Sequence, residues 1–583
     1  MYRTEYPRPQ LVRNDWQCLN GTWNFKLEGD AEWRKIEVPF AFQAPLSGIG
    51  TNDMCDDMVY ERTMEVPKEW KGKKVILHFG AVDYRCRLYV NGGYVGKHTG
   101  GNTSFSFDIT SYLNWEKEVI RLEVNDPCKD ETIPRGKQFW MEEQKFIWYT
   151  RTSGIWQTVW MEPVDEVYIK NVKYTSDVDE GSVLIEYECS KECPDAEIQF
   201  NISMDGENVV NATQKGVKKE GKIKLYLYEN QIFRMPHYEI HWCWCPENPK
   251  LFDTQIQIKQ NDVVFDSIEG YFGLRKIETK NGRVYLNNRP YYQKLILDQG
   301  YWPDGLMTAP SDEALKQDIL MSKEMGFNGC RKHQKSEDPR FLYWADKLGY
   351  IVWAEIGACA AFSDKSVKRT VMEWTEAMYR DYSHPCIVAW VVLNESWGVA
   401  QICNDFKQQA HAMALYYQMK SLDDTRLIVG NDGWEMVKTD ICAIHNYNHG
   451  SKEELVKQET FEKVLSTTEN LLRSEATGRN LYAEGYSYQG EPMILTEFGG
   501  ISYCTDGGKD WGYTSVSGEE EFLETYERLM RVIRKSEALF GYCYTQLTDV
   551  EQEVNGLLTY DRKYKIAPEK IRELNDMQVI NLL

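Results

Sequence analysis

The chain of 583 residues is too long for a single hydrophobic core, so about three domains are expected. A formal net charge of -21 makes nucleic acid and anionic membranes unsuitable partners. No apolar run is long enough to cross a bilayer and the first residues form no apolar h-region, so neither a membrane span nor a signal peptide is expected. The 15 Cys residues follow no disulfide pattern of a small secreted domain, so reduced thiols and a cytoplasmic location are expected.

Aromatic residues make up 13% of the chain, including 19 Trp and 36 Tyr. The flat apolar faces of sugars stack on such rings, so this surplus is compatible with carbohydrate binding. Domains rich in β-strands also favour aromatic residues, and composition alone leaves both explanations open.

Two all-β domains are predicted in the first half of the chain. Within residues 1–163, runs of alternating hydrophobicity at 73–80, 84–92 and 119–126 are separated by Gly, Asn and Asp, and NGGYVG at 91–96 predicts a hairpin. Many short strands favour a two-sheet sandwich of the jelly-roll type. Residues 164–273 continue the β pattern over about 110 residues, which favours an immunoglobulin-like sandwich.

From residue 274 to 583, apolar strands alternate with amphipathic helices, the pattern of a parallel α/β fold. Helices are predicted at 311–326, with a Ser cap, and at 517–537, acidic at its start and basic at its end. Eight strands predict a (β/α)8 or TIM barrel, since no glycine-rich nucleotide turn supports a doubly wound sheet. The predicted strands are 291–297, 328–333, 351–357, 387–395, 427–433, 441–447, 493–499 and 539–547.

Functional side chains of such a barrel lie at the C-terminal ends of its strands. These positions are rich in polar and ionisable residues, which is costly for stability and typical of a functional site. Glu395 and Glu497 stand at the ends of the fourth and seventh strands, on roughly opposite sides of the mouth. The full set is Asp298, Gln299, Arg331, His333, Glu355, Asn394, Glu395, Asn431, Asp432, residues 445–447, Glu497, Gln546 and Asp549.

Two facing carboxylates meet the needs of glycosidic bond hydrolysis. One donates a proton to the leaving oxygen, and the other meets the oxocarbenium-like centre. A separation of about 5–5.5 Å predicts retention through a glycosyl-enzyme, and mutual repulsion is expected to keep one carboxyl protonated near neutral pH. Either Glu alone is more simply explained as a capping or bridging residue, whereas the pair on these two strands favours catalysis.

The segments WVVLNESWG (390–398) and PMILTEFGG (492–500) resemble the two catalytic segments of glycoside hydrolase family 2, which includes β-galactosidases, β-glucuronidases and β-mannosidases. Residues 271–278 and 325–355 also resemble the family, whose domain order covers nearly the whole chain. The resemblance implies Glu395 as acid/base, Glu497 as nucleophile, and a hydrogen bond from Asn394 to the sugar 2-hydroxyl. The implied activity is that of a retaining exo-β-glycosidase acting by double displacement.

Further sugar contacts are expected around this pair. Tyr447 resembles the tyrosine that hydrogen-bonds the nucleophile in the family. In the first domain, residues 135–138 and 149–157 resemble family segments, and packing between domains is the favoured explanation there. The other candidates are Asp298, Arg331 and His333 for glycone hydroxyls, and Trp302, Trp353 and Trp434, which are either stacking platforms or packed rim residues.

The sugar itself is less well defined. β-Glucuronidases of the family carry an Asn-x-Lys motif for the substrate carboxylate, and residues 547–565 lack it. Arg331, Lys332 and Lys335 place three cations near the second strand, where they either serve a uronic acid or are solvated loop charges. A galactoside is the first choice, with a glucuronide, a galacturonide or another β-glycoside as alternatives.

No metal or other cofactor is expected, because the metal ligands of the family's larger β-galactosidases have no counterparts in this sequence. The expected partner is a small carbohydrate or glycoconjugate, and a homo-oligomer is possible by analogy with the family. Transglycosylation would use the same residues. A catalytically silent carbohydrate-binding protein is the alternative from another class, disfavoured because both carboxylates are present.

Overall fold

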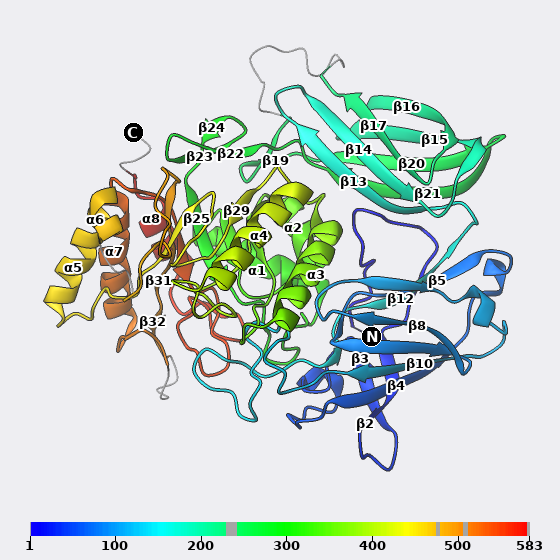
Figure 1. Ribbon diagram of the computed structural model, residues 1–583, viewed down its shortest axis with the longest axis horizontal. Helices are drawn as coiled ribbons and strands as arrows, with labels where there is room; N and C mark the ends of the chain where they lie inside the picture. Colours follow the sequence, from blue (N-terminus) through cyan, green and yellow to red (C-terminus); the bar gives the residue numbers. More distant parts are fainter. Residues whose placement is uncertain (1, 229–241, 474–477, 505–510, 580–583) are drawn as a thin grey trace.

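The computed structural model describes residues 2–228, 242–473, 478–504 and 511–579. Three units follow one another along the chain: a β-sandwich in blue, a second sandwich in cyan to green, and a barrel covered by helices (Figure 1). The predicted fold class, two β-sandwiches followed by a TIM barrel, is confirmed.

The first sandwich consists of two antiparallel sheets and a short strand pair, β6 (Val82–Asp83) with β11 (Gly154–Ile155). In strand β10 (Glu118–Asn125) every second side chain is buried, including Ile120, Leu122 and Val124, as expected for a strand with one face on the core. One sheet contains β3 (Arg34–Val38), β2 (Gly21–Leu27), β4 (Asp57–Met64), β10 (Glu118–Asn125), β7 (Arg85–Val90) and β8 (Gly93–Thr99). The other contains β1 (Gln17–Cys18), β12 (Val159–Val164), β5 (Lys74–Phe79) and β9 (Phe105–Asp108).

The predicted hairpin at 91–96 joins β7 to β8. Asn91 and Gly92 both have positive φ, 50° and 80°, which is the backbone of the tight turn that Asn-Gly favours.

The second sandwich packs two antiparallel sheets around its own core. One sheet contains β13 (Ile169–Asp177), β14 (Ser182–Cys189) and β17 (Glu220–Tyr226). The other contains β16 (Glu207–Val217), β15 (Cys193–Met204), β20 (Phe252–Gln260) and β21 (Val263–Phe272). Small ladders link it to the barrel: β18 (Trp244–Cys245) with β19 (Asn248–Pro249), and β22 (Ile277–Lys280), β23 (Arg283–Leu286) and β24 (Arg289–Pro290).

The barrel sheet has eight parallel strands in the order β29-β28-β27-β26-β25-β34-β31-β30. Each of them overlaps one of the eight predicted strands. Among the described residues no ladder joins β29 to β30, so the barrel is nearly closed. The strands are β25 (Gln293–Asp298), β26 (Gly329–Lys332), β27 (Ile351–Glu355), β28 (Ile387–Val391), β29 (Leu427–Val429), β30 (Cys442–His445), β31 (Met493–Gly499) and β34 (Leu539–Thr545).

Helices cover the outside of the barrel (Figure 1). The predicted cap is confirmed, since Ser311 accepts a hydrogen bond from the Ala314 amide at 3.1 Å. In the fully described stretch 430–441, the connection from β29 to β30 has no helix. The helices are α1 (Asp312–Glu324), α2 (Pro339–Leu348), α3 (Asp364–Asp381), α4 (Phe406–Leu422), α5 (Leu455–Ser466), α6 (Thr468–Arg473), α7 (Glu519–Lys535) and α8 (Pro568–Asn575), and a short pair, β32 (Ile501–Ser502) with β33 (Thr514–Ser515), lies between β31 and α7.

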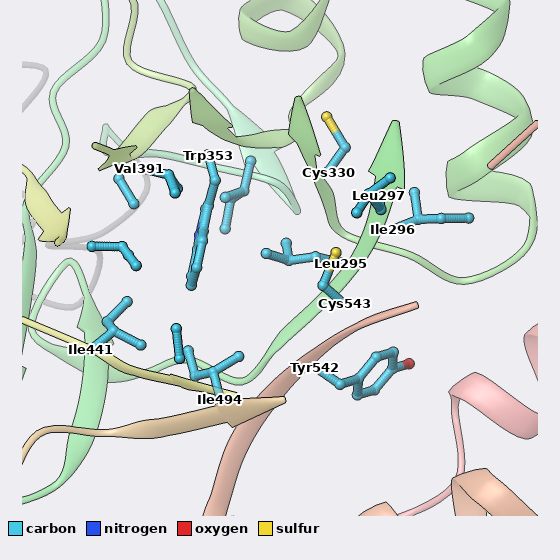
Figure 2. Close-up of a cluster of buried hydrophobic side chains, with 14 of the residues drawn as sticks. Leu295, Ile296, Leu297, Cys330, Trp353, Val391, Ile441, Ile494, Tyr542 and Cys543 are labelled. Atoms are coloured by element: carbon cyan, nitrogen blue, oxygen red, sulfur yellow. The ribbon is translucent and has the colours of Figure 1, made fainter. Parts of the chain in front are cut away.

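The barrel interior is filled by side chains. Figure 2 shows Trp353 of β27 pointing inward among side chains that include Leu295, Val391 and Ile494. Trp353 is 0% exposed, and its indole donates a hydrogen bond to Gln293 at 2.7 Å. The stacking role considered for Trp353 is therefore wrong, because its ring belongs to the packed layer below the barrel mouth.

Candidate active site

Arg331, at the end of β26, is the central cation of the barrel mouth. Its side chain is 0% exposed and is surrounded by carboxylates from three other strands or their loops. Its Nε lies 2.8 Å from Asp432 and is also paired with Glu355, and its Nη1 donates to Glu497 at 2.8 Å. Its Nη2 donates to Asn394 at 2.5 Å. The planar guanidinium can meet several acceptors at fixed angles, so Arg331 orients the polar groups of the mouth.

Glu497 lies in β31 and is held as an anion. Tyr447 donates a hydrogen bond to its Oε2 at 2.7 Å, while Arg331 binds Oε1. Burial favours the neutral acid, but the charges of His445 and Arg331 outweigh it and lower the pKa of Glu497 to about 2. A carboxylate that is ionised, buried and fixed at both oxygens suits a nucleophile.

Glu395 lies in a tight turn beyond β28. The strand ends at Val391, not at Glu395 as predicted, because the chain turns away from the sheet. Glu395 and Ser396 have positive φ values of 50° and 59°, which are strained for residues with side chains. The Glu395 amide donates to the Asp432 carbonyl at 2.9 Å, which fixes the turn against the neighbouring strand.

The two carboxylates approach one another across the mouth. One oxygen of Glu395, one oxygen of Glu497 and one ring nitrogen of His445 lie within 4.8 Å of each other. This places the carboxyl groups near the separation of about 5–5.5 Å that leaves room for a covalent sugar intermediate but not for an interposed water.

His445 connects the two carboxylates. Its Nδ1 lies 2.8 Å from Glu395 and 3.4 Å from Glu497, and its Nε2 lies 3.1 Å from Asp432. Burial opposes the charged imidazolium, but Glu497, Asp432 and the hydrogen bond to Glu395 raise the pKa of His445 to about 10. At neutral pH the mouth therefore contains two fixed cations, His445 and Arg331.

The charge of His445 predicts a pH-dependent stability. Because its folded-state pKa of about 10 lies above the ordinary value of 6.5, its contribution is complete below pH 6.5 and is lost as the pH rises through 10. We expect the free energy of unfolding to fall across this range, by at most about 1.4 kcal/mol per pH unit, and His445→Gln to remove that part of the slope. Urea unfolding measured across the range tests this.

His411→Gln is the matched control, because burial lowers the pKa of His411 to about 4 and leaves it neutral throughout this range. A slope that is the same in His445→Gln and in the wild type contradicts a charged His445.

The remaining predicted residues divide into two groups. Asn394 and His333 lie near Glu395 and Glu497: both contact Arg331, His333 through Nδ1 at 3.1 Å. Burial and the cations Arg331 and Lys137 hold the pKa of His333 well below its usual value, so it is neutral. Asp298 lies apart from Glu395 and Glu497; among the described residues its partners are the Gly300 amide and Lys332.

Asp298 belongs to a buried ionic cluster behind the mouth. Lys332 lies 2.7 Å from both Asp298 and Glu337, and Lys335 lies 3.0 Å from Glu337. Both ammonium side chains are 1% exposed. Lys332 and Lys335 are therefore not solvated loop charges, because they are buried. They are also not free to bind a uronic acid, because Asp298 and Glu337 neutralise them.

Two Trp residues were candidates for sugar stacking. Trp302 is 3% exposed, and its ring is covered by Arg562 at 4.8 Å and Lys335 at 5.2 Å, which favours the packing alternative. Trp434 is partly exposed and lies edge-on to His445 with ring centroids 5.6 Å apart. Trp434 is therefore the candidate that the fold brings next to His445, which contacts Glu395 and Glu497.

Sequence reasoning missed residues from loops. Tyr513 stacks on Tyr447 with centroids 3.5 Å apart, and Lys137, Tyr149 and Glu553 gather beside the mouth. Lys137 and Tyr149 lie in the first-domain segments 135–138 and 149–157, so the resemblance of those segments was the available signal. Glu553 lies in the segment 547–565, which was considered only for the missing Asn-x-Lys motif, and its contact with Tyr149 depends on packing against a distant domain.

Two groups of described residues offer ligand types that metals prefer. One is Glu395, His445 and Glu497, and the other is Asp346, His384 and Cys386. In the second group both carboxylate oxygens of Asp346 already have hydrogen-bond partners. His384 Nδ1 lies 2.6 Å from Oδ2, and the Cys386 amide donates to Oδ1 at 2.8 Å, so the group is a satisfied hydrogen-bond cluster. Among the helices of the described ranges, none has the length and apolarity needed to cross a bilayer.

Family models match the chain along nearly its whole length. They are the sugar binding domain of glycosyl hydrolases family 2 at residues 18–162, the model named glycosyl hydrolases family 2 at 167–275, and the TIM barrel domain of that family at 277–579. The chain belongs to glycosyl hydrolase family 2.

The curated relatives include both β-galactosidases and β-glucuronidases. The chain is 25% identical over 417 residues to a β-galactosidase of Thermoanaerobacter pseudethanolicus, covering 68% of this chain and 53% of that protein. It is 25% identical to a β-glucuronidase of Streptococcus agalactiae, covering 67% and 68%. The chain thus spans about half the length of the first relative. The structure of a β-D-glucuronidase of Dictyoglomus thermophilum shares the fold, with a TM-score of 0.79, 20% identity, and 98% and 99% of the chains covered.

Proposed function

We propose that the protein is a retaining exo-β-glycosidase that acts by double displacement. The observation that supports this most strongly is that one carboxylate oxygen of Glu395 and one of Glu497 lie within 4.8 Å of each other. Glu395 lies in the turn after β28 and Glu497 lies in β31, on opposite sides of the barrel mouth. Inverting enzymes need a gap of about 6.5–9.5 Å between the carboxyl groups for the attacking water. The shorter gap favours a covalent intermediate.

In the first step Glu497 attacks the anomeric carbon while Glu395 donates its proton to the aglycone oxygen. Arg331 and Tyr447 hold the Glu497 oxygens, so the anion is positioned before substrate binds. In the second step Glu395 takes a proton from water, and this water releases the sugar from Glu497. His445, 2.8 Å from Glu395, orients the acid/base in both steps.

We further propose a β-galactoside as the substrate. Lys332 and Lys335 are neutralised by Asp298 and Glu337, so they supply no free cation for a substrate carboxylate. Residues 547–565 also lack the Asn-x-Lys motif that the family's glucuronidases use. The 15 Cys residues are all free thiols, which supports a reducing, cytoplasmic compartment.

A panel of nitrophenyl β-glycosides followed by proton NMR tests this proposal. We expect release from the β-galactoside, with the β-anomer of the free sugar formed first and mutarotation following. Formation of the α-anomer first contradicts double displacement, whereas release from the galacturonide or glucuronide alone contradicts the sugar assignment. No release from any member of the panel favours the silent carbohydrate-binding protein.

A further inference from the structure

A cavity of about 610 Å³ lies where the two sandwiches and the barrel meet. Its walls come from β5, β9 and β12 of the first sandwich, from β13 of the second, and from the last turns of α3. The barrel contributes mainly this covering helix, so the cavity lies outside the barrel, whereas Glu395 and Glu497 face its mouth. Sites for small molecules have volumes of about 300–1,000 Å³. The cavity is therefore separate from the candidate active site and large enough for a ligand.

One wall is a face of the four-stranded sheet in the first sandwich. Trp160 of β12, His78 of β5 and Ser106 of β9 are direct cross-strand partners, so their side chains share this face. The His78 ring stacks on Trp160 with centroids 4.7 Å apart. Burial lowers the pKa of His78 to about 3, so the imidazole is neutral at physiological pH. The wall thus offers an uncharged ring and a hydroxyl.

Two buried polar side chains of the lining are left unpaired by the protein. Gln157, just before β12, is 4% exposed, and its Nε2 has no hydrogen-bond partner among the described residues. His78 is 8% exposed, and its Nε2 also lacks such a partner, since the Glu162 carboxylate lies 3.7 Å away. Buried polar groups are nearly always hydrogen-bonded. A ligand in the cavity can supply the bonds that these side chains lack.

Tyr379 of α3 adds an accessible aromatic ring to the lining. It is 59% exposed, yet its position is fixed, because its hydroxyl donates to Glu188 of β14 at 3.0 Å. This bond joins the barrel to the second sandwich beside the cavity. An accessible ring with a fixed position is a surface on which the apolar face of a sugar can stack.

The charged side chains of the lining already have partners among the described residues. Glu376 of α3 accepts a hydrogen bond from Thr103 at 2.6 Å. The ion pairs are Arg8–Glu162 at 2.9 Å, Lys170–Glu188 at 2.5 Å, Lys173–Glu186 at 3.7 Å, Asp338–Arg3 at 2.7 Å and Arg380–Asp381 at 2.6 Å. A charged ligand would lose its hydration without gaining a free counter-charge. The lining therefore favours a neutral ligand that is rich in hydroxyl groups.

We propose that this cavity is a second binding site, for a neutral saccharide, outside the catalytic barrel. Each sugar hydroxyl can donate and accept, as can the carboxamide of Gln157, the imidazole of His78 and the hydroxyl of Ser106. The apolar face of the sugar stacks on Tyr379. Because all three domains form the walls, a bound sugar stabilises their packing and raises the unfolding temperature. This site does not depend on the proposed glycosidase activity.

Equilibrium dialysis with radiolabelled galactose, glucose, maltose and cellobiose counts the bound molecules. The full chain with Glu497→Gln is used, so that no sugar is consumed. We expect Ser106→Trp, which fills the cavity from an exposed strand position, to lower the count by one for at least one of these sugars. Ser111→Trp is the matched control, because Ser111 is an exposed serine of the same domain outside the lining, and it should keep the count.

Two further variants test the lining without filling the cavity. Gln157→Leu and Tyr379→Ala should each raise the Kd of this site by about 3- to 10-fold, because one removes a hydrogen-bonding group and the other the stacking ring. Tyr417→Ala, at a similarly exposed tyrosine of α4, should leave the Kd unchanged. Thermal unfolding shows that each variant is folded, and the sugar should raise the unfolding temperature less in Ser106→Trp than in Ser111→Trp.

The site is overturned if Ser106→Trp and Ser111→Trp bind equal numbers of molecules for all four sugars. It is also overturned if Gln157→Leu and Tyr379→Ala bind as tightly as Tyr417→Ala, or if galacturonic acid binds the cavity more tightly than galactose. Failure of the glycosidase proposal has a different signature. Nitrophenyl β-glycosides would then release nothing with the wild type, while Ser106→Trp would still lower the count by one.

Discussion

Replacing Glu497 by Gln lowers kcat on the preferred β-glycoside on the order of 10⁵-fold, because the amide keeps the shape of the side chain but cannot attack the anomeric carbon. Glu497 is buried with both oxygens engaged, so the loss is expected in kcat, with substrate binding kept. Steady-state rates and calorimetric binding measure the two effects separately.

Glu524→Gln provides the matched control, since it makes the same chemical change at an exposed site on α7, where Glu524 is paired with Lys452 at 3.0 Å. Its activity should equal that of the wild type. Retention of more than a hundredth of the activity in Glu497→Gln, measured on freshly purified protein free of wild-type contamination, contradicts the nucleophile assignment.

Azide distinguishes the two carboxylates from each other. In Glu497→Ala the small anion can enter the space of the lost side chain and attack directly, giving an α-glycosyl azide. In Glu395→Ala the glycosyl-enzyme still forms from a substrate with a good leaving group, and azide then gives the β-glycosyl azide. Exchange of these two products between the variants would reverse the roles of Glu395 and Glu497.

Arg331→Met is expected to destabilise the protein by about 3–5 kcal/mol, because it removes the shared cation from the buried carboxylates Glu355, Asp432 and Glu497. Activity should change in a defined way as well. Arg331 helps to hold the pKa of Glu497 at about 2, so its loss raises that pKa and moves the acid limb of kcat/KM to higher pH. Urea unfolding and the pH profile measure the two effects.

Arg531→Met is the control, because it makes the same substitution in an exposed salt bridge instead of a buried one. Arg531 is exposed on α7 and pairs with Glu527 at 2.5 Å, so its loss should cost no more than about 1 kcal/mol. An Arg331→Met protein as stable as Arg531→Met, with an unshifted acid limb, contradicts the central role of the guanidinium.

Local patterns were enough to predict the fold class. Period-two strands, helix caps and the alternation of strands with helices are short-range signals, and they identified all eight barrel strands. Strand ends also predicted that Arg331, Glu355, Asp432 and Glu497 share the mouth, because the barrel brings all C-terminal strand ends together.

Local patterns could not predict which charged side chains are buried or which of them form ion pairs. Lys332 and Arg331 are neighbours in sequence, yet alternation along β26 directs Lys332 to the ionic cluster with Asp298 and Arg331 to the barrel mouth. Nothing local indicates that Glu337 will neutralise Lys332, or that β28 ends before Glu395. The approach of Tyr149 to Glu553 depends on docking of two domains, which no sequence window contains.

The contact between Tyr149 and Glu553 also determines when during synthesis the mouth can be completed. The first sandwich leaves the ribosome early and can fold as a unit, as N-terminal domains generally do. Tyr149 and Thr150 of this domain cannot form their hydrogen bonds until nearly the entire barrel has been synthesised, because their partners Glu553 and Glu551 lie beyond the last strand. A chain that stopped between Glu497 and Glu553 would contain both carboxylates of the proposed mechanism and still lack the contacts that join the first domain to the barrel mouth.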